Sequence, residues 1–209
     1  MNMNTVFSSA KIMLPDVIEP EKWAVIACDQ FTSEPEYWEE CERIIGSSPS
    51  AYDFILPEAF LGTVKETKKK ESIRKAMKSI EDYPTYTVEG FIALERTLPD
   101  HTVRRGIIGK VDLEHYDYSP ESSSLIRPTE KTVVSRIPPR VRIRSDATVE
   151  IPHILVFARP GCRFIKKAFS LTEGKKPDYD FELMMGGGSV RGYSLSGKIS
   201  TELEKEIMT

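Results

Sequence analysis

The stretch YTVEGFIAL, residues 86–94, decides the fold class of this chain. From Tyr86 to Leu94, apolar or small side chains alternate with more polar neighbours, a period typical of a β-strand with one buried face. A second alternating run occupies residues 103–113, and the loop 97–102 separates it from the first. The pattern predicts a β-hairpin.

Further apolar runs predict more strands on both sides of this hairpin. The continuous run WAVIAC, residues 23–28, predicts a buried strand that ends at Asp29. Shorter strands are predicted at residues 154–157, 164–169, 179–184 and 190–195, with Gly- and Pro-containing turns between them.

Helical spacing predicts a few helices among these strands. Residues 33–36 resemble a capping box, and apolar side chains then recur at helical spacing until Gly46, which ends the helix. A charged helix is expected over residues 65–82, and another helix is expected to begin at Thr129. A final segment, residues 201–208, predicts a helix that is frayed or that contacts a second copy in a homo-oligomer.

Strands interleaved with a few helices favour an α+β fold with a mixed β-sheet, in a single domain over residues 1–209. The chain has 209 residues, of which 40% are hydrophobic and 29% are charged, and these values exclude a disordered or fibrous chain. The net charge of −3 gives no general attraction to nucleic acid. No apolar run is long enough to span a membrane, no signal sequence is visible, and three separated cysteines favour neither disulfides nor zinc. A cytoplasmic protein is expected.

One segment stands out by its charge. Residues 127–144 carry six cationic side chains and a single acid. The cations are Arg127, Lys131, Arg136, Arg140, Arg142 and Arg144. Arginine is favoured for bidentate contact with phosphate, so the segment is a candidate site for a nucleotide or a phosphorylated metabolite. The alternative is a strand on which Arg140, Arg142 and Arg144 face solvent.

Two carboxylates are candidates for proton transfer or cation binding. Glu130 would stay ionised at a helix start beside Arg127, and its ordinary alternative is a helix-capping role. Asp29 follows the expected strand 23–28, where a crevice can border a sheet, and its alternative is a turn residue. The polar cluster at 112–117 contains three acids and His115, and it is either a weak magnesium site or a solvated loop.

Several strings together resemble one family over almost the whole chain. They are WAVIACDQFTS (23–33), PEYW (35–38), YDFILPE (52–58), IRPTEKTV (126–133) and RIPPRVRIR (136–144). These motifs, in this order, are similar to those of the prokaryotic family called domain of unknown function 1015.

The resemblance extends to the superfamily that contains the ParB amino-terminal domain and sulfiredoxin, whose members bind or hydrolyse nucleotides and include kinases of free serine. It implies a ParB/sulfiredoxin-like fold and ATP or ADP with magnesium as the ligand. It also implies that the strings 127–130 and 136–144 belong to a nucleotide or phosphate pocket, without assigning a step to any residue. Our candidates for phosphate binding are Arg127, Thr129, Lys131, Arg136, Arg140 and Arg142, and the candidate catalytic carboxylates are Glu130 and Asp29.

The leading hypothesis is therefore a nucleotide-dependent phosphotransferase that acts on a small polar metabolite such as serine. The alternative is a noncatalytic module that binds a nucleotide or phosphate. Family members are longer, and after the segment matching residues 187–193 they carry an Asp-Gly-Asn-His or Asp-Gly-His-His string that is absent here. We therefore expect this chain to match the amino-terminal part of the family's architecture, with incomplete catalytic machinery.

Overall fold

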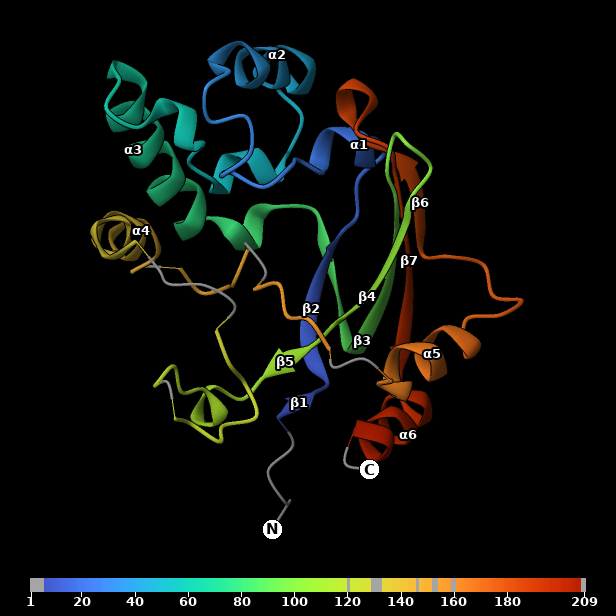
Figure 1. Cartoon of the computed structure of the whole chain (residues 1–209). Helices are drawn as coiled ribbons and strands as arrows, with labels where there is room; N and C mark the ends of the chain where they lie inside the picture. Colours follow the sequence, from blue (N-terminus) through green and yellow to red (C-terminus); the bar gives the residue numbers. More distant parts are fainter. Residues whose placement is uncertain are drawn as a thin grey trace.

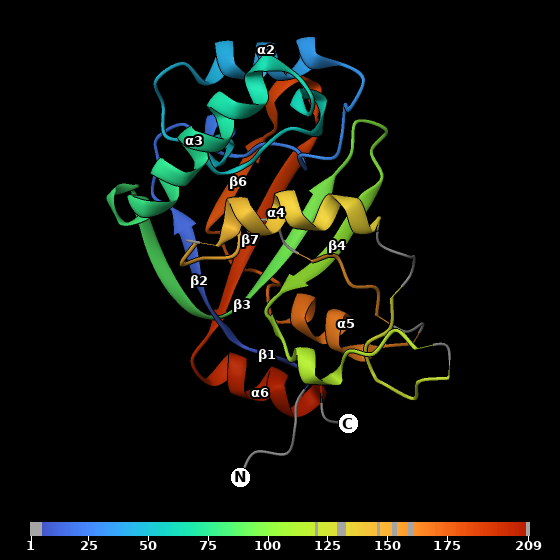
Figure 2. The ribbon, with the colours of Figure 1, turned by 90° about the vertical axis from the view of Figure 1, so that its left-hand side faces the viewer.

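The computed structural model describes residues 6–119, 121–128, 133–145, 147–151, 154–158 and 161–207. An antiparallel sheet occupies the middle of the molecule, and α2 and α3 lie beyond one of its ends (Figures 1 and 2). The helices are α1 (Pro20–Trp23), α2 (Pro35–Ile45), α3 (Val64–Lys78), α4 (Ile137–Arg144), α5 (Arg163–Ser170) and α6 (Lys198–Ile207). The strands are β1 (Phe7–Ser8), β2 (Ala10–Pro15), β3 (Thr85–Thr97), β4 (Val103–Ile108), β5 (Lys110–Val111), β6 (Tyr179–Glu182) and β7 (Ser189–Ser196).

The long strand β3 organises the sheet. Its first half pairs with β2, and its second half pairs with β4 on the same edge and with β7 on the other edge. Strand β6 then pairs with β7, and every pairing between these strands is antiparallel. Gly90 lies where the β2 pairing ends and the β7 pairing begins. Its φ of +152° suits glycine, and a Cβ there would lie 2.4 Å from the carbonyl oxygen of Leu195.

One face of the sheet carries the largest part of the core. Phe91 and Ala93 of β3 and Leu195 of β7 are fully buried against α5 and α6. Helix α5 contributes Phe164 and Ala168, which are four residues apart and therefore share one side of the helix. This packing joins β3 of the hairpin to two helices that follow much later in the chain.

A second group of apolar side chains lies beyond the end of the sheet. Trp38 and Cys41 of α2 pack against Tyr52 and Phe60 from the segment between α2 and α3. A neighbouring cluster joins Ile73 of α3 to further side chains of that segment. The described part of the chain thus has separate apolar clusters at the sheet and beyond its end.

The α+β fold class predicted from the sequence is confirmed. The hairpin forms as β3 and β4, and the strands expected at 179–184 and 190–195 form as β6 and β7. Helices α2 and α3 match the two expected amphipathic segments, with α2 ending at Gly46. The helix start expected at Thr129 lies outside the described residues.

The strand predicted at residues 23–28 is wrong. Trp23 is the last residue of α1, and residues 24–28 belong to no helix or strand. Val25, Ile26 and Cys28 instead pack against the cluster around Trp38. A short apolar run shows only that the segment is buried, because burial against helices demands the same side chains as burial in a sheet.

Two other strand predictions are also wrong. Residues 164–169 lie in the helix α5, because the Phe164, Ala168 and Phe169 side chains all reach the sheet core from one side of a helix. Residues 154–157 form no strand, and their four apolar side chains are each at least 53% exposed. A continuous apolar run of six residues or fewer fits either period.

Among the described residues, no helix combines the length and the apolar character needed to cross a membrane. The last helix forms as α6, and its Leu203 is fully buried in the core against the sheet rather than left for an external contact. The α6 helix also holds the start of the chain, since Glu204 accepts hydrogen bonds from the backbone N–H and the hydroxyl of Ser9.

Leu203→Ala should therefore lower the free energy of unfolding by roughly 2–5 kcal/mol, the usual range for a buried leucine. Urea unfolding followed by circular dichroism measures the change. Lys205→Ala, an exposed position on the same helix, is the control and should change stability by less than about 0.5 kcal/mol. Equal stability of the two variants would contradict the packing of α6.

Lys69 of α3 is an unusual cation. Its Nζ lies 3.4 Å from the centre of the Tyr52 ring, and the Tyr52 hydroxyl donates a hydrogen bond of 2.7 Å to Glu42. Burial lowers the pKa of the Lys69 amine to about 8, although the carboxylates of Asp53 and Glu42 act in the opposite direction. The folded state therefore holds the Lys69 proton less firmly than the unfolded chain does.

This difference predicts a pH dependence of stability. Below pH 8 the Lys69 amine is charged in the folded and the unfolded state, so its burial lowers the stability of the fold in full. This loss of stability disappears as the pH rises from about 8 to the ordinary lysine pKa of 10.5. Relative to Lys69→Met, the wild-type chain should therefore gain stability between pH 8 and pH 10. Denaturant unfolding at each pH measures this difference. Lys68→Met, a change at an exposed position of the same helix, is the matched control variant.

Candidate functional site

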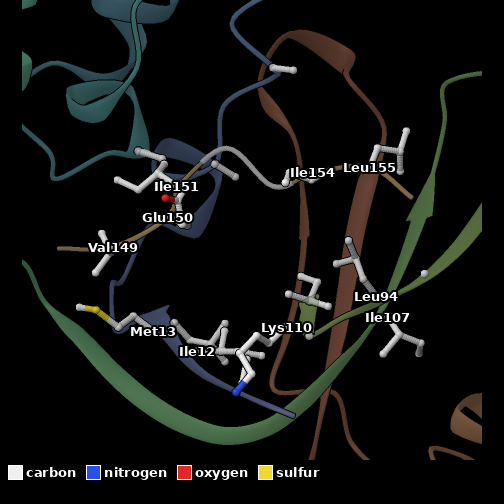
Figure 3. A pocket seen from close by; sticks show the side chains of 18 of the residues that line it. Ile12, Met13, Leu94, Ile107, Lys110, Val149, Glu150, Ile151, Ile154 and Leu155 are labelled. Carbon is white, nitrogen blue, oxygen red and sulfur yellow. The ribbon is translucent and has the colours of Figure 1, made fainter. Parts of the chain in front are cut away.

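The face of the sheet opposite the α5/α6 core borders a wide hollow. Alternation along the strands places Ile12 of β2 and Leu94 of β3 on this face. Figure 3 shows residues 149–151 and 154–155 on the far side of the hollow, across from these strands. The loop 24–29 and α4 complete the wall.

The hollow has a volume of about 3380 Å³. Small-molecule sites typically measure ~300–1,000 Å³, so the hollow as a whole is not one ligand pocket. Much of its lining is apolar, including the exposed residues 154–157. A candidate site must therefore be sought where polar side chains converge on its wall.

One such place is the wall formed by the loop 24–29, by Glu58 and by α4. Arg140 of α4 forms an ion pair with Glu58, whose side chain is only 9% exposed. The backbone N–H of Glu58 donates a hydrogen bond of 2.8 Å to the carbonyl oxygen of Cys28. Asp29 follows directly, is exposed, and forms no ion pair within the described part of the chain. A thiol, two carboxylates and a guanidinium thus meet on the hollow wall, and we call this group the Cys28 cluster.

Electrostatics connects the members of the Cys28 cluster. Burial raises the pKa of the Cys28 thiol, and the negative charges of Asp29 and Glu58 raise it further. The Arg140 guanidinium acts in the opposite direction. The thiol is therefore neutral at pH 7 and is no activated nucleophile, whereas the exposed carboxylate of Asp29 is available to a ligand.

The helix α4 decides which cations of the basic segment face the hollow. Residues four apart share one side of a helix, so Arg140 and Arg144 both line the hollow while Arg142, between them, does not. The alternative of a strand over residues 140–144 is wrong for this reason. Arg144 lies 3.2 Å from the exposed carboxylate of Glu150, so both hollow-facing arginines of α4 have an acidic partner.

The other predicted site residues are separated from this group. Arg127 is exposed and donates a hydrogen bond of 3.3 Å to the carbonyl oxygen of Ser124, away from the hollow lining. The backbone of Arg136 ends the short 3-10 helix Val134–Arg136. Thr129, Glu130 and Lys131, together with the Arg136 side chain, lie outside the described residues.

Glu58 is a member of the cluster that the sequence analysis did not single out. It lies between Pro57 and Ala59, in the string LPEAF, without the neighbouring charges that draw attention to a carboxylate. A usable signal existed in the family-like string YDFILPE, which ends on this residue.

The acidic cluster after β5 does not form a metal site in the described part of the chain. Nε2 of His115 lies 3.9 Å from a carboxylate oxygen of Asp112, while Asp117 accepts hydrogen bonds from the N–H and hydroxyl of Ser119. Nowhere among the described residues do three His, Cys, Asp or Glu side chains converge as metal ligands would. A magnesium ion can nevertheless be held largely by the phosphates of a nucleotide, with few protein ligands.

Fold and site together define an α+β domain whose antiparallel sheet is packed on one face and open on the other to a largely apolar hollow with charged groups on its wall. The sequence profile of the family described as Protein of unknown function (DUF1015) matches residues 15–206. The chain therefore belongs to this family, as its motifs predicted. The comparisons with curated proteins and with solved structures gave no match.

The Cys28 cluster makes a prediction about thiol reactivity. Replacing the exposed Asp29 by Asn removes a charge that raises the pKa of Cys28, so alkylation of Cys28 by iodoacetamide at pH 8 should accelerate several-fold. Arg140→Gln should slow it. Peptide mass spectrometry separates Cys28 from the exposed Cys162, which should react at an unchanged rate in both variants. Unchanged rates at Cys28 would contradict the cluster.

Proposed function

We propose that this chain binds a nucleotide, ATP or ADP with magnesium, at the Cys28 cluster and transfers its terminal phosphoryl group to a small polar metabolite. The observation that supports this most strongly is the meeting of Arg140, from the basic segment, with Asp29, from the end of the loop 24–29, on one wall of the hollow. The sequence separates these two residues by more than a hundred positions, and the fold brings them together.

Phosphoryl transfer needs cations on the phosphate oxygens and a carboxylate that receives the proton of the attacking hydroxyl. Arg140 and Arg144 are the hollow-facing cations of α4. The ion pair of Arg144 with the exposed Glu150 is weak enough for a phosphate to replace, and the Arg140 side chain is itself 54% exposed beside Glu58. Asp29 is the available carboxylate.

The resemblance to the ParB/sulfiredoxin-like superfamily adds the substrate class. Serine is the first metabolite to test, because that superfamily includes kinases of the free amino acid. The second candidate function is a noncatalytic module that binds a nucleotide or a phosphorylated metabolite. It is favoured by the ion pair of Glu58 with Arg140, because that pair already occupies one of the cations that a transferred phosphoryl group would need.

Thermal unfolding with ATP and magnesium tests binding. A ligand at about a hundred times its Kd adds ~2.7 kcal/mol, which raises the Tm of a domain of this size by roughly 5–10 °C. Arg140→Ala should lose this rise relative to its own unliganded Tm. Arg142→Ala, a change on the same helix away from the hollow, should keep it. An equal rise in both variants would show that the nucleotide does not bind at α4.

A transfer assay then separates the two candidate functions. The chain is incubated with labelled ATP, magnesium and serine, and phosphoserine is measured by chromatography. Phosphotransfer should be lost in Asp29→Asn while the nucleotide-induced rise in Tm persists. A rise in Tm in the wild type without any transferred phosphate would support the binding module instead.

A further inference from the structure

A pair of cations that the sequence analysis did not single out lies on the hollow face of the hairpin. Arg96 of β3 is directly opposite Arg104 of β4 in the sheet register, and both residues line the hollow. Directly opposite side chains on one face of an antiparallel pair have Cβ atoms ~4.5–5.5 Å apart. Like charges at this separation destabilise the pairing unless something of opposite charge lies between them.

The other face of the same strands shows how this fold normally balances its arginines. Glu95 lies opposite both Arg105 and Arg191, with Nε of Arg105 at 2.8 Å and Nη1 of Arg191 at 3.9 Å from its carboxylate oxygens. Arg191 also pairs with Asp180 of β6 at 2.8 Å. On this face two carboxylates neutralise two guanidinium groups.

On the hollow face the described residues supply no such partner. No carboxylate among them forms an ion pair with Arg96 or Arg104, and Nε of Arg96 is buried without a hydrogen-bond acceptor. The acid nearest in sequence to Arg104 is Asp100, which accepts the backbone N–H of Thr102 at 2.9 Å and attracts Arg104 without forming an ion pair with it. A buried guanidinium N–H without an acceptor is unfavourable. Arg96 is partly buried and Arg104 beside it is exposed, so an anion in the hollow can reach the pair.

The surroundings of the pair indicate what kind of anion fits. Val190 of β7 lies opposite Arg96, and Leu94 precedes the pair along the same face. Gly106 lies next to Arg104 on that face, and a Cβ built there would meet no heavy atom within 4 Å. An apolar floor with open space therefore adjoins two cations.

We propose that Arg96 and Arg104 bind the dianionic phosphate group of an organic phosphate, whose apolar part lies over Leu94 and Gly106. Guanidinium groups bind phosphate oxygens in a bidentate manner, and a phosphomonoester carries a charge of about −1.5 to −2 at pH 7. The chain as a whole has a net charge of −3, so general attraction of anions does not explain such binding. The site goes beyond the proposed phosphotransfer, because it needs neither Arg140 nor Asp29.

Isothermal titration calorimetry with phenyl phosphate and with inorganic phosphate, at constant ionic strength, tests the site. Arg104→Gln should raise both Kd values about tenfold or more, as expected when a charged hydrogen-bond partner is lost. Arg142→Gln, which removes an exposed arginine away from the hollow, should leave both unchanged. Gly106→Val should weaken phenyl phosphate binding several-fold and leave inorganic phosphate unaffected, because it fills the space beside Arg104.

Arg96→Met supplies a second, independent variant. It should lose phosphate binding while its unliganded Tm stays equal to or rises above that of the wild type, since the change removes a desolvated cation that has no carboxylate partner. Phosphate binding that is unchanged in both Arg104→Gln and Arg96→Met would overturn the proposal, and so would a wild-type chain that binds neither probe. If Arg104→Gln still forms phosphoserine and keeps its phosphate affinity, the Arg96/Arg104 site is overturned and the proposed phosphotransferase is not. If the wild-type chain binds phosphate at Arg96 and Arg104 but transfers none to serine, the site is supported and the phosphotransferase is refuted.

Discussion

The alternation of side chains along β3 is the constraint on which the rest of the structure depends. Phe91 and Ala93 face α5 and α6, whereas Leu94 and Arg96 face the hollow. Because the side-chain period of a strand is two residues, a register slip by one position would place arginine in the core and phenylalanine in the hollow. Burial of the odd positions therefore fixes the orientation of the polar groups at the even positions.

The sequence predicted the elements whose period was long enough to be unambiguous. The hairpin around Tyr86–Leu94 and the amphipathic helices α2 and α3 each extend over enough residues to distinguish a period of two from a period of 3.6. The runs 23–28 and 164–169 are shorter, and what they pack against decides their structure. The first run packs against α2, which follows it closely, and the second packs against β3, which lies far away in the sequence.

The candidate site was predicted only in part, because the direction of its side chains depends on the folded helix and sheet. Charge counting identified residues 127–144 but could not show that a helix turns Arg140 and Arg144 to the hollow and Arg142 away from it. It also missed Arg96 and Arg104, because each has glutamate or arginine neighbours that hide it in a linear count. Their significance lies in the cross-strand register, and register is a property of the folded sheet.

The side chains that stabilise the fold differ from the arginines that line the hollow wall. The core on the α5/α6 face and the cluster around Trp38 supply the burial that stabilises the chain, and neither requires the arginines on the hollow wall. Substitutions at Arg96, Arg104 or Arg140 can therefore alter ligand binding without removing a core contact. A fold arranged in this way can exchange the ligand of its open face while it keeps the packed face unchanged, because binding energy and folding energy reside in different side chains.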